Sequence, residues 1–256
     1  MSTLHAEGLS LAVAGRTLCA DLDLAFAPGE CWALLGQNGA GKTTLLHTLA
    51  GLREPQAGRV YYDGRPLSQW RRRALARYLG LLPQDNADPF PATVLETALL
   101  GRHPHQGLWA ADSSEDRALA RAALAAVDMA ELEARSVARL SGGERRRLAV
   151  ATLLTQDPAV LLLDEPINHL DLRHGVGVLT RFRALADSGR SVIMSLHDPG
   201  LAARWCDRVL LLYGDGRWAA GTTAEMLTEE NLGALYGHPV RAVAGPYGPV
   251  FVPADH

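Results

Sequence analysis

The sequence has few cysteines, no long apolar run and almost no net charge, and each shortage excludes a class of protein. Its three cysteines, Cys19, Cys31 and Cys206, are an odd number without paired spacing. They exclude a disulfide framework and a cysteine zinc site, and they favour a reducing compartment. No stretch approaches the roughly 18 apolar residues that a membrane span needs. The formal net charge of −3 leaves no electrostatic footprint for nucleic acid, so we expect no nucleic-acid partner.

The N-terminal residues also lack the features of a secretory leader. Met1, Ser2 and Thr3 lead into His5 and Glu7, with neither a basic segment nor an apolar one. Hydrophobic residues make up 48% of the chain, which is enough to bury a core. We therefore expect a globular cytosolic protein that is able to dock on a membrane partner.

A glycine-rich stretch between a predicted strand and a predicted helix carries the first chemical signal. Cys31–Leu35 is a short apolar run typical of a buried strand, and Leu45, Leu46 and Leu49 recur at helical spacing. Between them the chain fits G-x-x-x-x-G-K-[ST]. A plain glycine-rich turn is the alternative, and the flanking strand and helix argue against it. The candidate nucleotide-binding residues are Gly36, Gln37, Asn38, Gly39, Ala40, Gly41, Lys42, Thr43 and Thr44.

A strand, a glycine loop and a helix start in this order form a phosphate cradle. The glycines let successive N–H groups point inward, and the helix N-terminus adds a partial positive charge. The Lys42 ammonium would reach the β- and γ-phosphates, and the Thr43 hydroxyl would ligate Mg²⁺. The sequence therefore predicts a nucleotide site.

Two acidic residues end a second buried strand. Val160–Leu163 is an apolar run followed by Asp164 and Glu165. Beside a nucleotide loop, Asp164 would hold Mg²⁺, and Glu165 would orient and deprotonate a water for attack on the γ-phosphate. Without that loop, we would interpret them as two acids that cap the next element.

Two further polar residues end predicted strands. Gln84 follows Leu79–Leu82 and is a candidate ligand for Mg²⁺ or for the attacking water. His197 follows Ser191–Leu196 and is a candidate γ-phosphate sensor. Each residue alone would more often be structural.

A second anion-seeking helix start lies far along the chain from the first. Leu140–Glu144 reads Leu-Ser-Gly-Gly-Glu and precedes a predicted helix over Arg145–Leu154. Ser141, Gly142 and Gly143 are therefore candidates for phosphate contact. One chain thus carries two candidate phosphate-binding helix starts, in different lobes.

The chain changes from strand-rich to mostly helical at Asp85 and returns to strands after Asp157. We expect a nucleotide-binding core from residues 1–84 and 158–240, a helical lobe over 85–157, and a C-terminal tail over 241–256 that forms a small hairpin.

Within these lobes, three segments have predicted local structures. We expect a loop over Asp88–Pro91 and one helix over Leu67–Tyr78. The basic run Arg71–Arg73 in that helix is either a solvated face or a contact with a partner or lipid headgroups. His103 and His105 lie in a loop without a nearby carboxylate or thiol, which disfavours a metal site.

Together, these motifs resemble those of the ATP-binding-cassette ATPases, in order and over nearly the whole chain. The matches are Walker A at Gly36–Thr43, the Q-loop at Gln84, the signature at Leu140–Glu144, Walker B at Val160–Asp164 with the catalytic glutamate Glu165, the D-loop around Leu170 and Asp171, and the switch histidine His197. The resemblance implies an α/β fold: a P-loop NTPase (RecA-like) core, an N-terminal antiparallel β subdomain and an inserted helical subdomain. It implies ATP and Mg²⁺ as cofactors, with Thr43, Gln84 and Asp164 around the metal.

The family resemblance also implies partners. Two such cassettes stack head to tail, so that Ser141 and Gly142 of one copy close on the ATP held by the other. Gly101–His105, Asp164–Asp171 and His197-Asp198 are similar to the cassettes of importers for iron–siderophore complexes, haem and cobalamin. Such a homodimer lies under two membrane permease subunits, which a periplasmic or surface substrate-binding protein feeds. We expect it at the cytoplasmic face of the bacterial inner membrane, with permease helices docked near Gln84–Pro91.

Three positions depart from the family pattern. Around Val13-Ala14-Gly15 the chain lacks the aromatic residue that usually stacks on adenine, so nucleotide affinity or base preference is expected to be weaker. Ile167 replaces the usual Thr, and Arg146 replaces the usual Gln after the signature. Neither replacement removes a group that the chemistry needs.

Two alternatives to an importer ATPase fit a single cassette. One is a soluble cassette without a transport role, such as an iron–sulfur cluster assembly ATPase; the Gly101–His105 stretch argues against it. The other is a nucleotide-binding protein that does not hydrolyse, and Glu165 argues against that. The sequence does not distinguish a siderophore, haem or cobalamin cargo.

Overall fold

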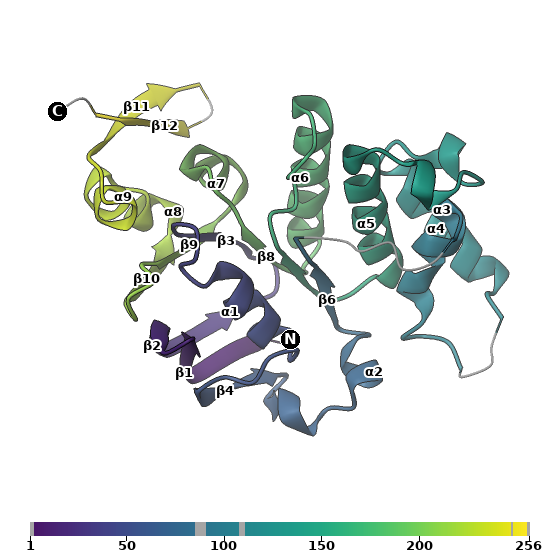
Figure 1. Ribbon diagram of the computed structural model, residues 1–256, viewed down its shortest axis with the longest axis horizontal. Helices are drawn as coiled ribbons and strands as arrows, with labels where there is room; N and C mark the ends of the chain where they lie inside the picture. Colours follow the sequence, from purple (N-terminus) through teal and green to yellow (C-terminus); the bar gives the residue numbers. More distant parts are fainter. Residues whose placement is uncertain (1–2, 85–90, 108–110, 247, 255–256) are drawn as a thin grey trace.

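A six-stranded sheet forms the centre of the structure. Its strands are β3 (Cys31–Leu35), β6 (Leu79–Leu82), β7 (Val160–Leu163), β8 (Ser191–Ser195), β9 (Arg208–Leu212) and β10 (Trp218–Thr222). They lie in the order β10-β9-β3-β8-β7-β6, and all are parallel to their neighbours except β10, which pairs antiparallel with β9. This computed structural model describes residues 3–84, 91–107, 111–246 and 248–254 (Figure 1).

Both faces of this sheet are covered, which explains why its parallel strands are continuous apolar runs. Along β3, Cys31, Ala33 and Leu35 pack in one hydrophobic cluster, whereas Trp32 and Leu34 pack in another on the opposite face. Because parallel strands end at the same edge, the residues that follow them come together there, outside the carboxyl ends.

An antiparallel sheet lies next to the central one. Its strands are β1 (Leu4–Val13), β2 (Arg16–Phe26), β4 (Ala57–Tyr62) and β5 (Arg65–Pro66), in the order β2-β1-β4-β5. Helix α1 (Lys42–Leu49) contacts both sheets, because Leu45 and Leu46 share a hydrophobic cluster with Leu22 of β2 and Leu34 of β3. The N-terminal β subdomain and the core thus have one common interior (Figure 1).

A helical subdomain projects from the β6–β7 side of the central sheet (Figure 1). It contains α3 (Val94–Leu99), α4 (Ser114–Ala125) and α5 (Gly142–Gln156). All three helices begin with a capping box, in which the N-cap side chain and a carboxylate three residues later satisfy each other's backbone N–H groups. The guanidinium of Arg102 forms an ion pair of 2.7 Å with Asp116, which joins the end of α3 to α4.

The remaining helices and a terminal hairpin complete the chain. The helices are α6 (Leu172–Asp187), α7 (Pro199–Trp205), α8 (Thr223–Met226) and α9 (Glu229–Tyr236), and the hairpin pairs β11 (Val240–Gly245) with β12 (Gly248–Pro253). Short 3₁₀ turns cover Leu67–Gln69, Leu100–Arg102, Ala130–Leu132 and Val137–Arg139. Within the described ranges, no helix combines the length and apolar character that a membrane crossing requires.

The single helix predicted over Leu67–Tyr78 is wrong. The segment has a 3₁₀ turn, then Trp70 in an extended conformation with ψ 138°, then the short helix α2 (Arg72–Leu75). The extended backbone directs the Trp70 ring against Tyr62 and Tyr78, with ring centroids 5.8 and 5.7 Å apart. This aromatic packing outweighs the helical pattern. The loop expected over Asp88–Pro91 lies outside the described residues except for Pro91.

Candidate functional site

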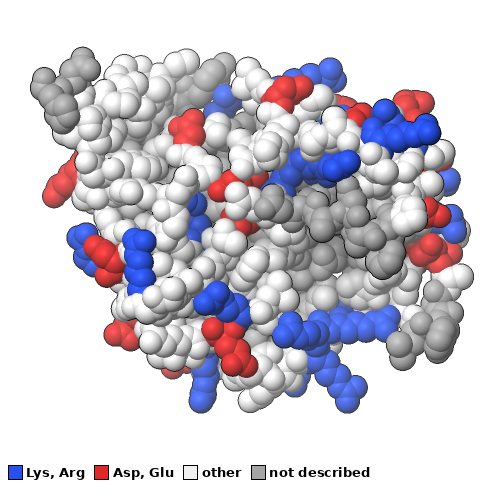
Figure 2. All heavy atoms as spheres, in the orientation of Figure 1, with Lys and Arg blue, Asp and Glu red and all other residues white. Residues whose placement is uncertain are grey.

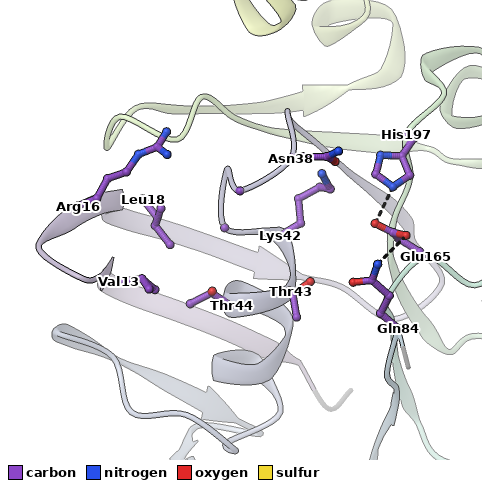
Figure 3. A pocket seen from close by; sticks show the side chains of 12 residues that line it. Val13, Arg16, Leu18, Asn38, Lys42, Thr43, Thr44, Gln84, Glu165 and His197 are labelled. Carbon is purple, nitrogen blue, oxygen red and sulfur yellow. Dashed lines mark hydrogen bonds and ion pairs between the residues drawn. The ribbon is translucent and has the colours of Figure 1, made fainter. Parts of the chain in front are cut away.

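A cavity of about 620 Å³ opens where β3 meets α1, at the carboxyl edge of the central sheet (Figure 3). One wall comes from the antiparallel sheet, the floor from the glycine loop, and the far wall from the residues that follow β6, β7 and β8. The lining residues are Val13, Arg16, Leu18, Asn38, Gly39, Gly41, Lys42, Thr43, Thr44, Gln84, Glu165 and His197. Six of the nine predicted loop residues therefore face the cavity, and Gly36, Gln37 and Ala40 do not line it.

Two glycines are required by the shape of the loop. A Cβ atom at Gly36 would lie 2.6 Å from the carbonyl oxygen of Leu212, so a side chain there would separate β3 from β9. Gly41 has φ +106°, and a Cβ atom there would lie 3.0 Å from Cβ of Leu18. The first glycine of the motif is thus required by close packing against β9, and Gly41 is required by its left-handed backbone. Gln37, which lies between them, donates from Nε2 to the carbonyl oxygen of Leu235 at 2.9 Å.

Lys42 places its ammonium group over the loop. Its Nζ donates to the carbonyl oxygens of Gly36 at 2.7 Å and Gln37 at 3.2 Å. Burial lowers the pKa of Lys42 from its ordinary value, and the charges of Glu165 and Asp164 oppose this shift. A largely buried cation at the start of a helix favours an anionic ligand, because phosphate oxygens would replace the lost hydration.

Glu165 is the centre of the opposite wall. Its carboxylate accepts from Nε2 of Gln84 at 3.2 Å, and His197 Nε2 lies 2.6 Å from its Oε1 atom (Figure 3). The side-chain amide of Asn168 also donates to this carboxylate. The structure thus brings the three predicted residues Gln84, Glu165 and His197 into one hydrogen-bonded group.

The backbone of Glu165 is in a conformation that non-glycine residues rarely adopt. Its φ is +48°, in the left-handed region. Its N–H donates to Oγ of Ser195 at 2.8 Å, and its carbonyl oxygen accepts from Nη2 of Arg146 at 2.7 Å. These two bonds hold the peptide groups on both sides of the strained residue.

Asp164 is fully buried behind Glu165, with one carboxylate oxygen satisfied and one free. Its Oδ1 accepts from Oγ of Ser195 at 2.6 Å. Its Oδ2 is a buried oxygen for which the described part of the chain supplies no hydrogen-bond partner. A buried carboxylate oxygen without a partner fits the oxygen ligands that Mg²⁺ prefers. The charge of Asp164 acts on Lys42 of the cavity, and Asp164 itself does not line the cavity.

The other predicted phosphate contacts lie away from the cavity. Ser141, Gly142 and Asp171 are exposed, and neither they nor Gly143 line it. Ser141 is the N-cap of α5, where its Oγ accepts from the Glu144 N–H at 3.2 Å. Within one chain, the helix start at Ser141 therefore does not contribute to the cavity formed by the glycine loop.

Three groups at the site were not found from the sequence. Arg16 lines the cavity and is fixed by a hydrogen bond from Nε to the carbonyl oxygen of Gly214 at 2.9 Å. Asn168 contacts the Glu165 carboxylate, and Ser195 holds Asp164 and Glu165. The contact of Asn168 could have been predicted, because this residue lies only three positions after Glu165. The contacts of Arg16 and Ser195 depend on strands distant in sequence.

His105 and His103, which were considered for metal, have other neighbours. Nε2 of His105 lies 2.9 Å from the carbonyl oxygen of Gln156, and the carbonyl oxygen of His103 accepts from Nη2 of Arg73 at 3.0 Å. Among the described residues, no group of three or more His, Cys, Asp or Glu side chains is placed to hold a metal ion.

Comparison with known proteins agrees with this geometry. The ABC transporter family model matches residues 19–168, more than half of the chain. The hemin import ATP-binding protein HmuV of Nocardia farcinica is 43% identical over 250 residues, which cover 95% of this chain and 86% of the relative. The protein of the same name from Myxococcus xanthus is 43% identical over 249 residues, covering 93% and 92%.

A solved structure has the same fold over the whole chain. It is an inward-facing ABC transporter described as being of the metal-chelate type, with a TM-score of 0.85 and 29% identity, and it covers 100% of this chain and 98% of that chain. The predicted family and fold class are therefore confirmed. The chain belongs to the ABC transporter family, as an ATP-binding and ATP-hydrolysing subunit of a transporter.

Proposed function

We propose that this chain hydrolyses ATP to drive the import of hemin across a bacterial membrane. The cargo assignment is supported by relatives that are 43% identical and are named hemin import ATP-binding proteins. The likeness to a transporter described as metal-chelate type agrees with it. Iron–siderophore complexes and cobalamin are the competing cargoes, and the experiment below distinguishes them.

The observation that carries the ATPase chemistry is the Glu165 carboxylate on the cavity wall across from Lys42. Lys42 would release its two loop carbonyls and bind the β- and γ-phosphates. The loop residues Asn38, Gly39 and Gly41, with Thr43 and Thr44 at the helix start, would surround the same phosphates.

Thr43, Gln84 and Asp164 would hold Mg²⁺. The free Oδ2 atom of Asp164 supports this assignment, because a buried carboxylate oxygen without a partner is costly unless a ligand satisfies it. When bound, the ion would neutralise charge that develops on the phosphate oxygens.

Glu165 would orient the attacking water and accept its proton. A general base must lie within hydrogen-bond reach of that water, and the Glu165 carboxylate lies on the cavity surface beside Gln84. His197 is positioned to donate to the carboxylate or to the γ-phosphate, which would make it sensitive to loss of that phosphate. Gln84 would switch between the carboxylate and the metal or water.

Arg16 would hold the adenine base in place of the missing aromatic residue. The end of the cavity away from Glu165 is lined by Val13, Leu18 and the Arg16 guanidinium (Figure 3). The bond to Gly214 fixes this planar group, so stacking on a base costs little conformational entropy. A guanidinium plane stacks on aromatic rings, and two aliphatic side chains would cover the rest of the base.

The active unit would be a homodimer with two shared nucleotide sites. Ser141, Gly142, Gly143 and Asp171 lie outside the cavity of their own chain, so they can contact ATP only across an interface. Leu172, next to Asp171, is 85% exposed, which is unusual for a leucine and suits a contact with the second copy. Hydrolysis would remove the phosphate bridge and open the dimer.

The permease contact expected near Gln84–Pro91 is not assigned there, because Gln84 lines the nucleotide cavity and residues 85–90 lie outside the described residues. A groove beside α2 and β6 would receive a permease instead. It has a volume of about 740 Å³ and is lined by Leu52, Val60, Trp70, Leu75, Leu81 and Gln156, among others. Gln156 of α5 donates to the carbonyl oxygens of Ala76 and Leu79 at 2.7 and 3.0 Å. Of the residues that line the groove, only Gln156 belongs to the helical subdomain, so a docked helix would contact mainly the rest of the chain and the end of α5.

Basic side chains surround this groove. Figure 2 shows arginine side chains gathered over α2, and Arg53, Arg59 and Arg72 line the groove. We therefore favour partner contact for part of the Arg71–Arg73 run, although Arg73 also bonds to His103. The permease segment would be apolar with acidic flanks.

The remaining assignments follow from the importer model. Residues 1–84 and 158–240 would act as the ATP-binding core, 85–157 as the moving helical lobe, and 241–256 as a tail. The dimer would lie on the cytoplasmic face of the inner membrane under two permease subunits, and a substrate-binding protein would deliver cargo from the other side.

The test is reconstitution with the permease encoded nearest to this chain. Proteoliposomes loaded with ATP would be given hemin, a ferric siderophore or cobalamin in parallel, with Glu165→Gln as the inactive control. The proposal predicts ATP-dependent uptake of hemin alone. Uptake of another cargo would overturn the hemin assignment. Co-purification with iron–sulfur assembly proteins and no permease would overturn the transport role.

A further inference from the structure

Arg146, on the second turn of α5, is a buried cation whose guanidinium is surrounded by backbone carbonyl groups. The residue is only 3% exposed. Its Nη1 donates to the carbonyl oxygens of Pro83 at 2.5 Å and Gln84 at 3.3 Å, and its Nη2 donates to those of Asp164 at 2.5 Å and Glu165 at 2.7 Å. Its Nε donates to the carbonyl oxygen of Pro166 at 3.2 Å. One side chain thus binds five carbonyls.

These five carbonyls belong to the two segments that carry the catalytic groups. Pro83 and Gln84 follow β6, and Asp164, Glu165 and Pro166 follow β7. Arg146 itself belongs to the helix that starts at Ser141. It therefore joins the helical subdomain to both catalytic segments of the core at a single point.

The bond to the carbonyl of Glu165 has a specific consequence. A residue with φ +48° is in a conformation that non-glycine residues rarely adopt, and it persists only where its surroundings fix it. Arg146 supplies the bond on the carbonyl side, and Ser195 of β8 supplies the bond on the N–H side. The direction of the Glu165 side chain depends on both.

We propose that Arg146 is a positioning residue that makes the placement of Glu165 and Gln84 depend on the placement of the signature helix. Arg146 lies five positions after Ser141, which is about 7.5 Å along a rigid helix. A nucleotide that binds at the start of α5 therefore moves Arg146 with it. Hydrolysis becomes efficient when this movement brings the Glu165 carboxylate to the water. The inference rests on the proposed role of Glu165 as the base.

A matched set of variants tests the proposal. Arg146→Gln, with the residue usual in the family, keeps two N–H donors in place of five, Arg146→Lys keeps the charge without the planar fork, and Arg146→Met keeps neither. Arg147→Gln is the control, because Arg147 lies on the same helix and its Nη1 also binds two carbonyls, those of Val127 and Asp128 at 2.8 and 2.7 Å, within the helical subdomain.

The readout is the separation of kcat from KM for ATP, with thermal stability measured beside it. We expect Arg146→Gln to lower kcat about 10-fold and Arg146→Met about 100-fold, because a misplaced base loses most of its contribution. Arg146→Lys falls between wild type and Arg146→Met. KM stays within about threefold, because the phosphate loop is intact. Arg147→Gln lowers stability without a comparable loss of kcat.

Two outcomes would overturn the inference. One is a folded Arg146→Gln variant with the kcat of the wild type. The other is an equal loss of kcat in Arg146→Gln and Arg147→Gln that follows their loss of stability, which is the signature of a structural role. If Arg146→Met does not fold, the Gln and Lys variants still decide the question. Full turnover by Glu165→Gln would contradict the proposed function itself, so the two failures are distinguishable.

Discussion

The Nε2 atom of His197 lies 2.6 Å from Oε1 of Glu165, although 32 positions separate the two residues in the chain. They meet because β7 and β8 are parallel neighbours and both residues follow the carboxyl end of their strand. The same edge supplies Gln84, so the sheet order alone assembles the wall of the cavity across from Lys42.

Glu165→Gln should separate binding from hydrolysis. The amide fills the same space and retains an acceptor for Gln84, but it cannot take a proton from water. We expect ATP binding close to that of the wild type, a trapped ATP-bound dimer, and a loss of turnover of roughly 10²- to 10⁴-fold. Single-turnover ATPase assays and gel filtration with ATP measure both effects. Glu115→Gln, on an exposed turn of α4, is the control; normal turnover by Glu165→Gln would contradict the role of this carboxylate.

Lys42 is the only lysine in the sequence, which allows a direct chemical test. Its lowered pKa leaves more of the reactive neutral amine near neutral pH than an ordinary lysine has. Acylation followed by peptide mass spectrometry should show ATP protecting Lys42 while the N-terminal amine reacts unchanged. Lys42→Ala should lower turnover by about 100-fold or more, because a cation on the γ-phosphate is lost. Equal labelling with and without ATP would rule out the predicted contact.

Arg16→Ala should weaken nucleotide binding without changing the chemical step. Loss of a stacked guanidinium corresponds to about 1 kcal/mol, or a roughly fivefold rise in KM for ATP with kcat preserved. The effect should be smaller for a triphosphate without a base, because that ligand never reaches Arg16. Arg53→Ala removes an exposed arginine outside this cavity and serves as the control. A fall in kcat at constant KM would show that Arg16 has another role.

Asp116 should make the helical subdomain sensitive to acid. The guanidinium of Arg102, together with Ser113 and Gln106, holds the pKa of Asp116 well below its ordinary value. Because the folded pKa is the lower one, the stabilisation is complete above the unfolded value of about 3.9 and is lost as pH falls towards the folded pKa. Asp116→Asn should therefore be less stable at pH 7 and should lose less stability between pH 6 and pH 3. Parallel slopes of melting temperature against pH for both proteins would contradict this account.

The sequence was sufficient where local chemistry determines structure. Cys31–Leu35, the glycine loop and the leucines after Lys42 predict a strand, a turn and a helix because each pattern is local. Asp164 and Glu165 could be placed at a strand end for the same reason. The residues that surround the cavity thus follow from short motifs and from the rule that parallel strands end at one edge.

The sequence was insufficient where contacts between distant segments decide the outcome. Trp70 leaves the helical conformation because Tyr62 and Tyr78 pack against its ring. Arg146 was interpreted as a replacement without chemical consequence, yet its guanidinium binds the carbonyls on both catalytic segments. Arg16 was not predicted to contact the base, because the residue that usually stacks on adenine is aromatic. Its position over the cavity depends on Gly214, almost 200 residues later.

The most direct test of the account is the activity of a mixed dimer. Ser141→Ala and Lys42→Ala would each be purified, shown to be inactive, and combined into verified heterodimers. One of the two sites then has Lys42 from one subunit and Ser141 from the other. Sites shared between two copies predict that turnover returns to roughly half of the wild-type rate. Heterodimers that stay as inactive as the two parents would contradict shared sites.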